Sequence, residues 1–419
     1  MGETTDEPRL IEIVLRELDR PVGGDGLPVD SLGIASTDSL GRVGFVGTLA
    51  TEAGPEIFIW KDGAIIWRGS EAGDDAPANA SPMVGIGDAG EFVLRSAIKG
   101  KDTIWSHNGR LLTADEAAPG IPDATILLSS WTTMTPDGTA YWISEFRDGP
   151  GQRGKGRVLY RSPGASSDSI EVVLRSDDMV EGYPISRPFG LDFGYQVSNN
   201  KEHLIQVLRL DTGSTDDDEA VFIDGRLALR EGRATSGGGD WERFMQVAIN
   251  DNGDYLVSGE LDVVNTRDTV IAFNGEVVLQ EGQALGRKAI MPQAAVLALN
   301  IDNEGRAAHL WSVGGFGAQY LFFACDANRL DQSRLLVASN QQLQLAGSDE
   351  KVVIEGFNSV GHGPVLDLGP GDRLYTEVDL FYKERPDEPI GEAILSLPLP
   401  SCVSEDAAEP GVDVSGLAH

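Results

Sequence analysis

One short pattern recurs seven times along the 419-residue chain, and it limits the folds that the chain can adopt. Each copy is a strand-like run of eight residues whose second and eighth residues are apolar, and turns rich in Gly, Asp or Asn precede the copies. The copies lie at 42–49, 91–98, 139–146, 203–210, 254–261, 306–313 and 373–380. Such regular spacing indicates a repeat architecture rather than two or three unrelated domains.

Each copy continues into a second apolar strand, a second tight turn and a further strand. Ile57-Phe-Ile-Trp60 before Asp62-Gly63 and Val270-Ile-Ala-Phe273 before Asn274-Gly275 are examples. A short apolar stretch also precedes each first turn, so each unit holds four strands at a spacing of roughly 50 residues. The sequence therefore predicts an all-β fold, a seven-bladed β-propeller with four-stranded blades.

The two ends of the chain predict how the ring closes. The last unit stops after its third strand, at 393–397, and a matching fourth strand stands at the front of the chain, at 11–16. We expect this N-terminal strand to complete the last blade, which hides edges that would otherwise pair with other chains. The expected organisation is a leader at 1–9, a propeller at 10–400 and a tail at 401–419. The alternative folds are an open stack of sheets or two β-sandwiches. Neither would be stabilised by dividing one repeat between the two ends of the chain.

Two features leave alternatives open. Residues 325–356 contain two candidates for the outer strand of the sixth unit, at 335–337 and 352–354. Cys325 and Cys402 fall on or just beyond the third strands of the last two blades, which adjacent blades could bring together. We expect a disulfide there, and two separate thiols are the alternative.

The charge of the chain excludes some partners. Asp and Glu outnumber Lys and Arg by 66 to 33, for a formal net charge of -33. Such a surface repels phosphate, so we expect no nucleic-acid partner. No apolar run reaches the roughly 18 residues that a membrane-spanning helix needs, so direct membrane insertion is not expected. The first residues lack a signal-peptide pattern, and the chain is either cytoplasmic or begins after a removed signal.

The turn Asn250-Asp-Asn-Gly253 and outer strands of the form apolar-Leu-Arg followed by acidic and Gly residues resemble the bacterial tandem-repeat proteins of the "choice-of-anchor" type. The resemblance implies a secreted or surface-attached protein with no settled biochemical role. It carries over no functional residue, and residues 401–419 contain no sorting motif or apolar anchor. On this basis we expect an extracytoplasmic location: periplasmic, cell-surface or secreted.

The long segments predict a binding face. Segments 69–82, 147–156, 176–188, 211–219, 231–244 and 381–391 all connect middle strands or successive blades, which places them on the face opposite the tight turns; we call it the long-loop face. Its candidate binding residues are carboxylates with aromatic and imidazole groups among them: Asp74, Asp75, Asp115, Glu116, Asp177, Asp178, Tyr183, Asp240, Trp241, Glu242 and His362. In so acidic a chain, a merely solvated surface is the alternative.

Other candidates are weaker. Asp192, Gln246 and Asp367 fall on or near the innermost strands and could meet in the central channel. The acidic segment 211–219 offers oxygen ligands to calcium, the one cofactor considered, but it lacks the order of an EF-hand loop, which favours an ordinary acidic loop. No histidine pair has the spacing of a zinc or copper site, and His309 is expected in the core. A recurring arginine of the outer strands (Arg16, Arg68, Arg175 and Arg230) is expected to pair between blades.

No catalytic or metal motif stands out in the sequence. The leading hypothesis is a non-catalytic extracytoplasmic module that docks a protein partner or a glycan through the long-loop face. The alternative is a carbohydrate-active enzyme, a glycoside hydrolase or lyase, with carboxylates at the channel mouth.

Overall fold

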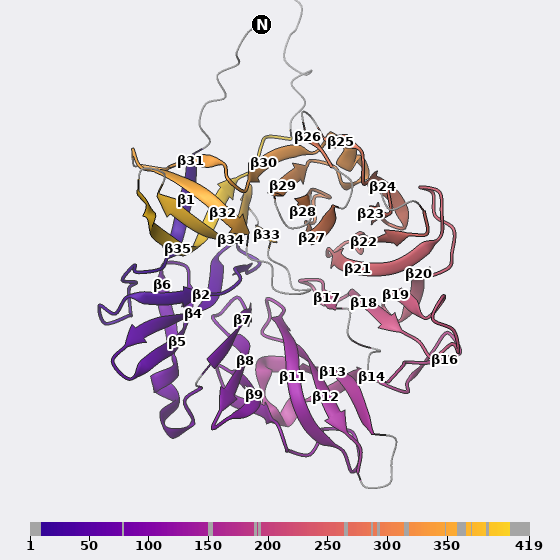
Figure 1. The fold of residues 1–419 in the computed structure, drawn as a ribbon. Coiled ribbons are helices and arrows are strands. Elements are labelled where there is room, and N and C mark those ends of the chain that lie inside the picture. Colours follow the sequence, from indigo (N-terminus) through magenta and orange to yellow (C-terminus); the bar gives the residue numbers. More distant parts are fainter. Residues whose placement is uncertain are drawn as a thin grey trace, which may run out of the picture.

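A computed structural model describes residues 10–77, 79–149, 154–187, 191, 194–263, 267–285, 288–290, 294–313, 318–347, 349–357, 366–369, 371–382 and 385–402. Seven antiparallel blades surround a central axis, and the chain passes through them in sequence order (Figure 1). The predicted seven-bladed β-propeller is confirmed.

Four strands build each blade, and the seven repeat copies form the second strand throughout. Blade 1 consists of β2 (Val29–Leu32) with β3 (Ser36–Thr37), β4 (Val43–Thr51), β5 (Gly54–Lys61) and β6 (Ala64–Arg68). Blade 2 consists of β7 (Asn79–Ile86), β8 (Phe92–Ile98), β9 (Lys101–Ser106) and β10 (Gly109–Thr113). Blade 3 consists of β11 (Thr125–Met134), β12 (Ala140–Arg147), β13 (Lys155–Ser162) and β14 (Glu171–Arg175).

The next three blades keep the same order. Blade 4 consists of β17 (Tyr195–Val197), β18 (Leu204–Arg209), β19 (Glu219–Ile223) and β20 (Arg226–Arg230). Blade 5 consists of β21 (Trp241–Ile249), β22 (Tyr255–Leu261), β23 (Thr269–Phe273) and β24 (Glu276–Gln280). Blade 6 consists of β27 (Ala295–Ile301), β28 (Ala307–Val313), β29 (Ala318–Ala324) and β30 (Arg334–Ala338).

Blade 7 is closed by the N-terminal strand, as predicted. Its strands are β33 (Leu366–Gly369), β34 (Arg373–Tyr382), β35 (Arg385–Pro398) and β1 (Leu10–Arg16). β1 runs antiparallel to β35, with Glu12 opposite Ser396 and Arg16 opposite Ala393. On its other side, the start of β1 pairs in parallel with β31 (Gln342–Leu345). The closing strand is therefore held along both edges.

The ambiguity at 325–356 is resolved by pairing. β30 is the outer strand of blade 6, because it pairs with β29. β32 (Lys351–Phe357) instead pairs with the second half of β34, beyond the part that β33 occupies. β32 and β33 together therefore form the innermost strand of blade 7.

Short elements connect successive blades: the 3-10 helix η1 (Gly69–Asp75) and the hairpins β15 (Met179–Val180) with β16 (Tyr183–Pro184) and β25 (Ala284–Leu285) with β26 (Lys288–Ala289). Three more 3-10 helices lie within a blade, between its third and fourth strands: η2 (Pro163–Ala165) and η3 (Ser167–Ser169) in blade 3, and η4 (Ala327–Gln332) in blade 6. Among the described residues, no helix has the length and apolar character to cross a membrane.

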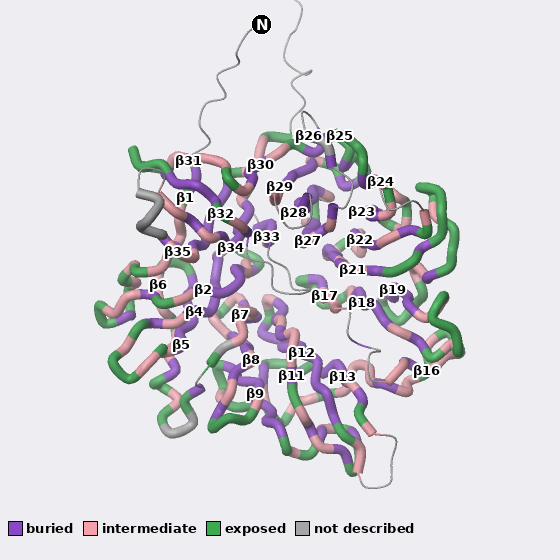
Figure 2. Tube along the Cα trace, viewed as in Figure 1, coloured by how far each residue is buried: buried purple, intermediate pink, exposed green. Residues whose placement is uncertain are grey.

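Apolar side chains on both faces of each blade explain why the blades stack. β12 and β28 are buried along nearly their whole length, and the exposed residues gather at the outer rim (Figure 2). The largest cluster joins blades 6 and 7 and includes Leu310, Leu321, Leu374 and Leu395, with Ile11 of the closing strand. Burial of the closing strand thus contributes to the same core that holds the last two blades together.

The first turns form a second set of contacts between blades. In the turn at 250–254, the Asn250 carboxamide oxygen accepts hydrogen bonds from the backbone N–H groups of Asn252 and Asp254 (3.0 and 2.9 Å). Its Nδ2 donates to the Asp302 carbonyl of the next blade (2.8 Å). The run Asn250-Asp-Asn-Gly253 is therefore a hairpin, as expected, and its side chains link neighbouring blades.

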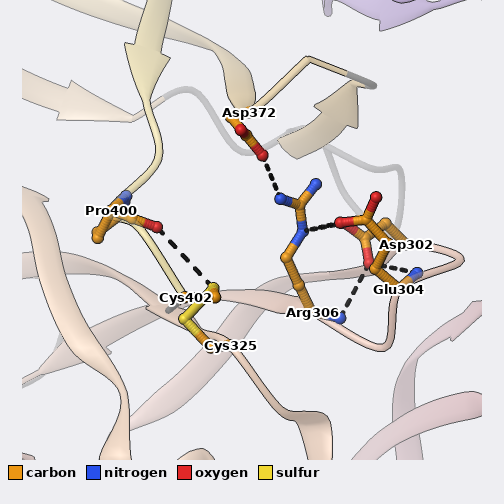
Figure 3. The surroundings of a disulfide bond; sticks show 7 residues. All are labelled: Asp302, Glu304, Arg306, Cys325, Asp372, Pro400 and Cys402. Carbon is orange, nitrogen blue, oxygen red and sulfur yellow. Dashed lines mark hydrogen bonds and ion pairs between the residues drawn. A yellow bond between two sulfur atoms is a disulfide. The ribbon is translucent and has the colours of Figure 1, made fainter. Parts of the chain in front are cut away.

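A disulfide joins Cys325 to Cys402, so the bridge expected from the sequence is confirmed (Figure 3). The two Cα atoms lie 5.4 Å apart, and the bridge spans 77 residues of sequence. Cys325 directly follows β29 of blade 6, and Cys402 follows β35 of blade 7. The bond ties the C-terminal end of the propeller to the preceding blade.

Candidate functional site

The described residues enclose a central cavity of about 470 Å³. Its wall comes from the second halves of the innermost strands and from the first turns, among them 36–39, 250–251 and 302–304. The cavity therefore lies toward the face of the tight turns, opposite the long-loop face. Its volume is in the range of small-molecule sites, which run from roughly 300 to 1,000 Å³.

A ring of polar residues lines the cavity at one level. Ser36, Thr133, Gln196, Asn300 and Asp367 each stand opposite the third residue of the repeat copy in their own blade. Because the blades repeat, equivalent positions come to the same height in the channel. We call these five residues the polar ring.

Three members of the polar ring also bind the next blade. Gln196 Oε1 accepts a hydrogen bond from the Ile249 N–H (2.8 Å), and Asn300 Nδ2 donates to the Leu366 carbonyl (3.0 Å). The carboxylate of Asp367 accepts from the Thr37 N–H across the seam where blade 7 meets blade 1. These contacts fix the three side chains at the wall.

Asp367 differs electrostatically from the other carboxylates of the wall. Desolvation raises its pKa to about 6, although hydrogen bonds from Thr37 oppose the rise. Asp38, by contrast, is ion-paired with Lys61 and Arg42 (2.8 and 2.7 Å). Burial opposes ionisation of Asp38, but these two cations outweigh it and lower its pKa. Within the described residues, Asp367 has no cationic partner.

Two aromatic residues stand across the cavity from Asp367. Trp131 lies on blade 3 and Tyr195 on blade 4, and in a seven-bladed ring these blades oppose blade 7 (Figure 1). Trp131 has a φ of 54°, in the left-handed region that bulky residues rarely adopt. It sits in a bulge of β11, and the Tyr195 hydroxyl donates to its carbonyl (2.5 Å). Such strain persists only where neighbours hold it.

The cavity mouth is rigid and acidic. Arg306 is the one basic residue among the described lining residues, and it is ion-paired with Asp302, Glu304 and Asp372 (Figure 3). The acidic lining residues are Asp38, Asp251, Asp302, Glu304 and Asp367. With its single cation engaged, the wall disfavours anionic ligands.

Several predicted binding carboxylates turn out to build a repeated turn. In six blades the last N–H of the outer strand donates to the side chain three residues later, which is Asp19, Glu71, Glu116, Asp178, Gln283 or Gln341. The residue before that acceptor has a left-handed φ in most of these turns, for example 70° at Asp115 and 71° at Asp177. Asp115, Glu116, Asp177 and Asp178 therefore have a structural task on the long-loop face.

The remaining predicted residues do not converge on one site. Asp177 is ion-paired with Arg187, which also binds Asp148 (2.6 Å). The guanidinium of Arg230 lies over the Tyr183 ring, 4.9 Å from its centroid.

Trp241 is 2% exposed and packs on Phe244, so it belongs to the core of blades 4 and 5, whereas its neighbour Asp240 is exposed. His362, Asp192 and the side chains of Asp74 and Asp75 lie outside the described residues. Of the channel candidates, Gln246 and Asp367 line the cavity.

The expectation that the recurring arginines pair between blades is wrong. Arg16 and Arg175 bind Asp19 and Asp178 of their own turns (3.3 and 3.4 Å). Arg230 binds Asp217 (2.9 Å) and Arg68 binds Glu56, each within its own blade. Arg68 also binds Asp25, in the segment that joins β1 to β2. A carboxylate three residues away, or on the adjacent strand, is closer than any on the next blade.

The calcium and histidine candidates have simpler explanations. In the loop 211–219, Asp217 is paired with Arg230 and Asp218 with Arg209 (3.5 Å). His309 is fully buried: it accepts from Trp311 Nε1 and contacts Ser333 Oγ (both 2.8 Å). Within the part of the chain that the structure describes, no three His, Cys, Asp or Glu side chains gather as metal ligands.

The cavity aromatics were missed because the sequence shows them only as part of an apolar strand. Met83, Trp131 and Met245 all line the wall, four or five residues before the first turn of their blades. Aligning the units on their first turns would have placed them at one level. The bulge that turns them toward the channel leaves no signal of its own.

Comparisons with known proteins identify no family for this chain. No protein-family model matches the chain, and no curated protein matches it. Among solved structures, a protein of unknown function from Bacteroides caccae is 15% identical over 70% of this chain and 93% of its own, with a TM-score of 0.32. Prolyl oligopeptidase B from Galerina marginata is 9% identical over 86% of this chain, with a TM-score of 0.44; this chain spans 51% of its length. Virginiamycin B lyase from Staphylococcus aureus is 11% identical over 89% of this chain and 99% of its own, with a TM-score of 0.34. Nothing about the activity of this chain follows from these similarities.

Proposed function

We propose that this chain is a non-catalytic binding protein that works outside the cytoplasm and holds a small carbohydrate, or the end of a glycan, in its central cavity. The observation that carries the proposal is the wall of that cavity. Its lining includes a carboxylate and two amides of the polar ring, on blades 7, 4 and 6, and two aromatic residues, Trp131 on blade 3 and Tyr195 on blade 4. Sugars need both kinds of group, because they have hydroxyls at their edges and apolar C–H faces.

The polar ring offers hydrogen-bonding capacity beyond the contacts between blades. The Nε2 of Gln196 and the Oδ1 of Asn300 have no partner within the described residues, while the opposite atom of each amide is fixed. A fixed donor and a fixed acceptor beside a cavity recognise a hydroxyl at a low cost in side-chain entropy. This arrangement favours a rigid, polyhydroxylated ligand.

The disulfide supports the extracytoplasmic part of the proposal. Disulfides persist in oxidising compartments and are rare in the cytosol. In the bridge between Cys325 and Cys402, Cys325 packs against the core shared by blades 6 and 7. Location can be tested by fractionating the source cells and probing periplasm, surface and medium with an antibody.

Binding can be tested by a glycan array followed by isothermal titration calorimetry on the best ligand. Trp131→Gly should weaken binding about tenfold or more, or ~1.4 kcal/mol, because it removes the aromatic ring. Glycine tolerates the left-handed φ of this position, so the variant should still fold. Asp62→Asn, on an exposed turn outside the cavity, is the control and should bind as the parent does.

Two results would count against the proposal. Undiminished binding to the Trp131→Gly variant would move the site elsewhere, to the long-loop face first of all. Cleavage of the bound glycan, followed by chromatography, would favour the alternative of a carbohydrate-active enzyme.

A further inference from the structure

The charges around the cavity are unbalanced in a way that the proposed function does not require. Five acidic residues and one basic residue line the wall, and that basic residue, Arg306, already binds three carboxylates. A neutral sugar would need no such imbalance. The whole chain also carries a formal charge of -33, which attracts cations toward any opening in its surface.

Among the carboxylates of the wall, Asp367 is the one best placed to bind a cation that this negative charge attracts into the cavity. It lies on β33, an innermost strand of the wall, and it forms no ion pair with the described residues. Its hydrogen bonds come from Thr37, and a carboxylate can accept about four hydrogen bonds in all. Acceptor capacity therefore remains beside the cavity without any cation of the protein to share it.

The energetic state of Asp367 points the same way. Desolvation raises its pKa to about 6, so ionisation of Asp367 is less favourable in the unliganded protein than it is for a carboxyl group in water. A cation brought into the cavity would favour the ionised form and form a charge-assisted hydrogen bond, which is roughly twice as strong as a neutral one. The protein supplies no such cation among its described residues, and a ligand would.

On the basis of the proposed function, we infer that the carbohydrate held in the cavity bears a free amine. The ammonium group of this amine binds Asp367, and an apolar face of the sugar packs toward Trp131 on the opposite wall. The amine end and the apolar face thus meet opposite sides of one cavity. Its volume of about 470 Å³ accommodates a mono- or disaccharide. Acidic sugars and phosphorylated sugars would be repelled by the carboxylates, because the one basic residue among the described lining residues, Arg306, is already ion-paired.

A matched pair of ligands tests this inference: the disaccharide of glucosamine and its N-acetylated counterpart, N,N′-diacetylchitobiose. They differ in charge at the two nitrogen atoms and share the same ring skeleton. Titration calorimetry at pH 6.5 is suitable, because Asp367 is then largely ionised and the free amines are largely protonated. We expect the free-amine sugar to bind at least tenfold more tightly than N,N′-diacetylchitobiose. We also expect its affinity to fall several-fold between 20 and 200 mM salt, because salt screens the charge interaction.

Asp367→Asn should abolish the preference, while its amide oxygen can still accept from the Thr37 N–H. Asp62→Asn removes the same charge outside the cavity and should keep the preference. Equal binding of the two sugars, or tighter binding of N,N′-diacetylchitobiose, would overturn the inference of a free amine and leave the carbohydrate proposal standing. A free-amine preference that survives in Asp367→Asn would also overturn that inference. If neither sugar binds, the amine inference fails, and the glycan array decides separately whether any carbohydrate binds.

Discussion

Removal of the disulfide should destabilise the propeller by an amount that the structure allows to be worked out. The bond between Cys325 and Cys402 closes a loop of 77 residues. In the chain-entropy model, a cross-link of this length lowers the entropy of the unfolded chain enough to stabilise the fold by about 4.5 kcal/mol at 25 °C. Unfolding entropy is about 2.1 cal/mol/K per residue, so the 419 residues give ~0.9 kcal/mol/K. The double variant Cys325→Ser, Cys402→Ser should therefore melt about 5 °C lower than the parent.

Differential scanning calorimetry with and without a reductant gives the test its control. The parent protein should lose the same ~5 °C when reduced, and the double variant should not respond to the reductant. A parent whose melting temperature is unchanged by reduction would refute the reasoning, because β1 and the blade core would then hold the ring closed by themselves. A variant that melts far lower than the reduced parent would show that serine disturbs the packing, not that the loop entropy is larger.

Three further predictions follow from single residues. Asp178→Ala should cost about 1 kcal/mol in urea unfolding, because the Arg175 N–H loses its acceptor, whereas Asp178→Asn should keep most of the stability; equal losses would contradict the turn that we describe. Desolvation raises the pKa of Glu231 to about 7 from 4.5, so between these pH values the folded chain keeps a proton that the unfolded chain has lost, and stability falls as pH rises. Glu231→Gln should remove this fall. If the difference in unfolding free energy between the parent and this variant stayed constant from pH 4.5 to 7, the raised pKa of Glu231 would be contradicted. Burial lowers the pKa of His309 to about 3 from 6.5, so this residue reduces stability as pH falls below 6.5; its imidazole should remain neutral at pH 5 by NMR, and a charged ring there would contradict the buried geometry.

Much of the fold could be predicted because repeated local patterns carry it. The second strands, the first turns and the borrowed strand 11–16 each show a signature of alternating apolar residues or of Gly, Asn and Asp at a turn. The seven copies reinforce one another, since the same pattern read seven times is hard to obtain by chance. The disulfide followed from the same register, because adjacent blades bring the ends of their third strands close together.

The candidate site was harder to predict because its residues have no common local pattern. Asp177 and Asp178 looked like a binding pair, yet they form part of a turn that recurs in other blades. In blade 5 the equivalent positions are occupied by Gly282 and Gln283. Trp241 looked like an exposed anchor and is buried. Local sequence reports which residues are polar or aromatic, and it does not report whether a neighbouring blade covers them.

The sequence by itself determined the class of fold, the number of blades and the strand that closes the ring. These depend on local hydrogen bonding and on the alternation of apolar residues. Only the tertiary structure decided that β32 joins blade 7, that the recurring arginines bind within their own blades, and that Asp367 stands across a cavity from Trp131. The physical reason is that these relations join residues far apart in the chain. Their partners are selected by packing and charge in three dimensions, which no short stretch of sequence encodes.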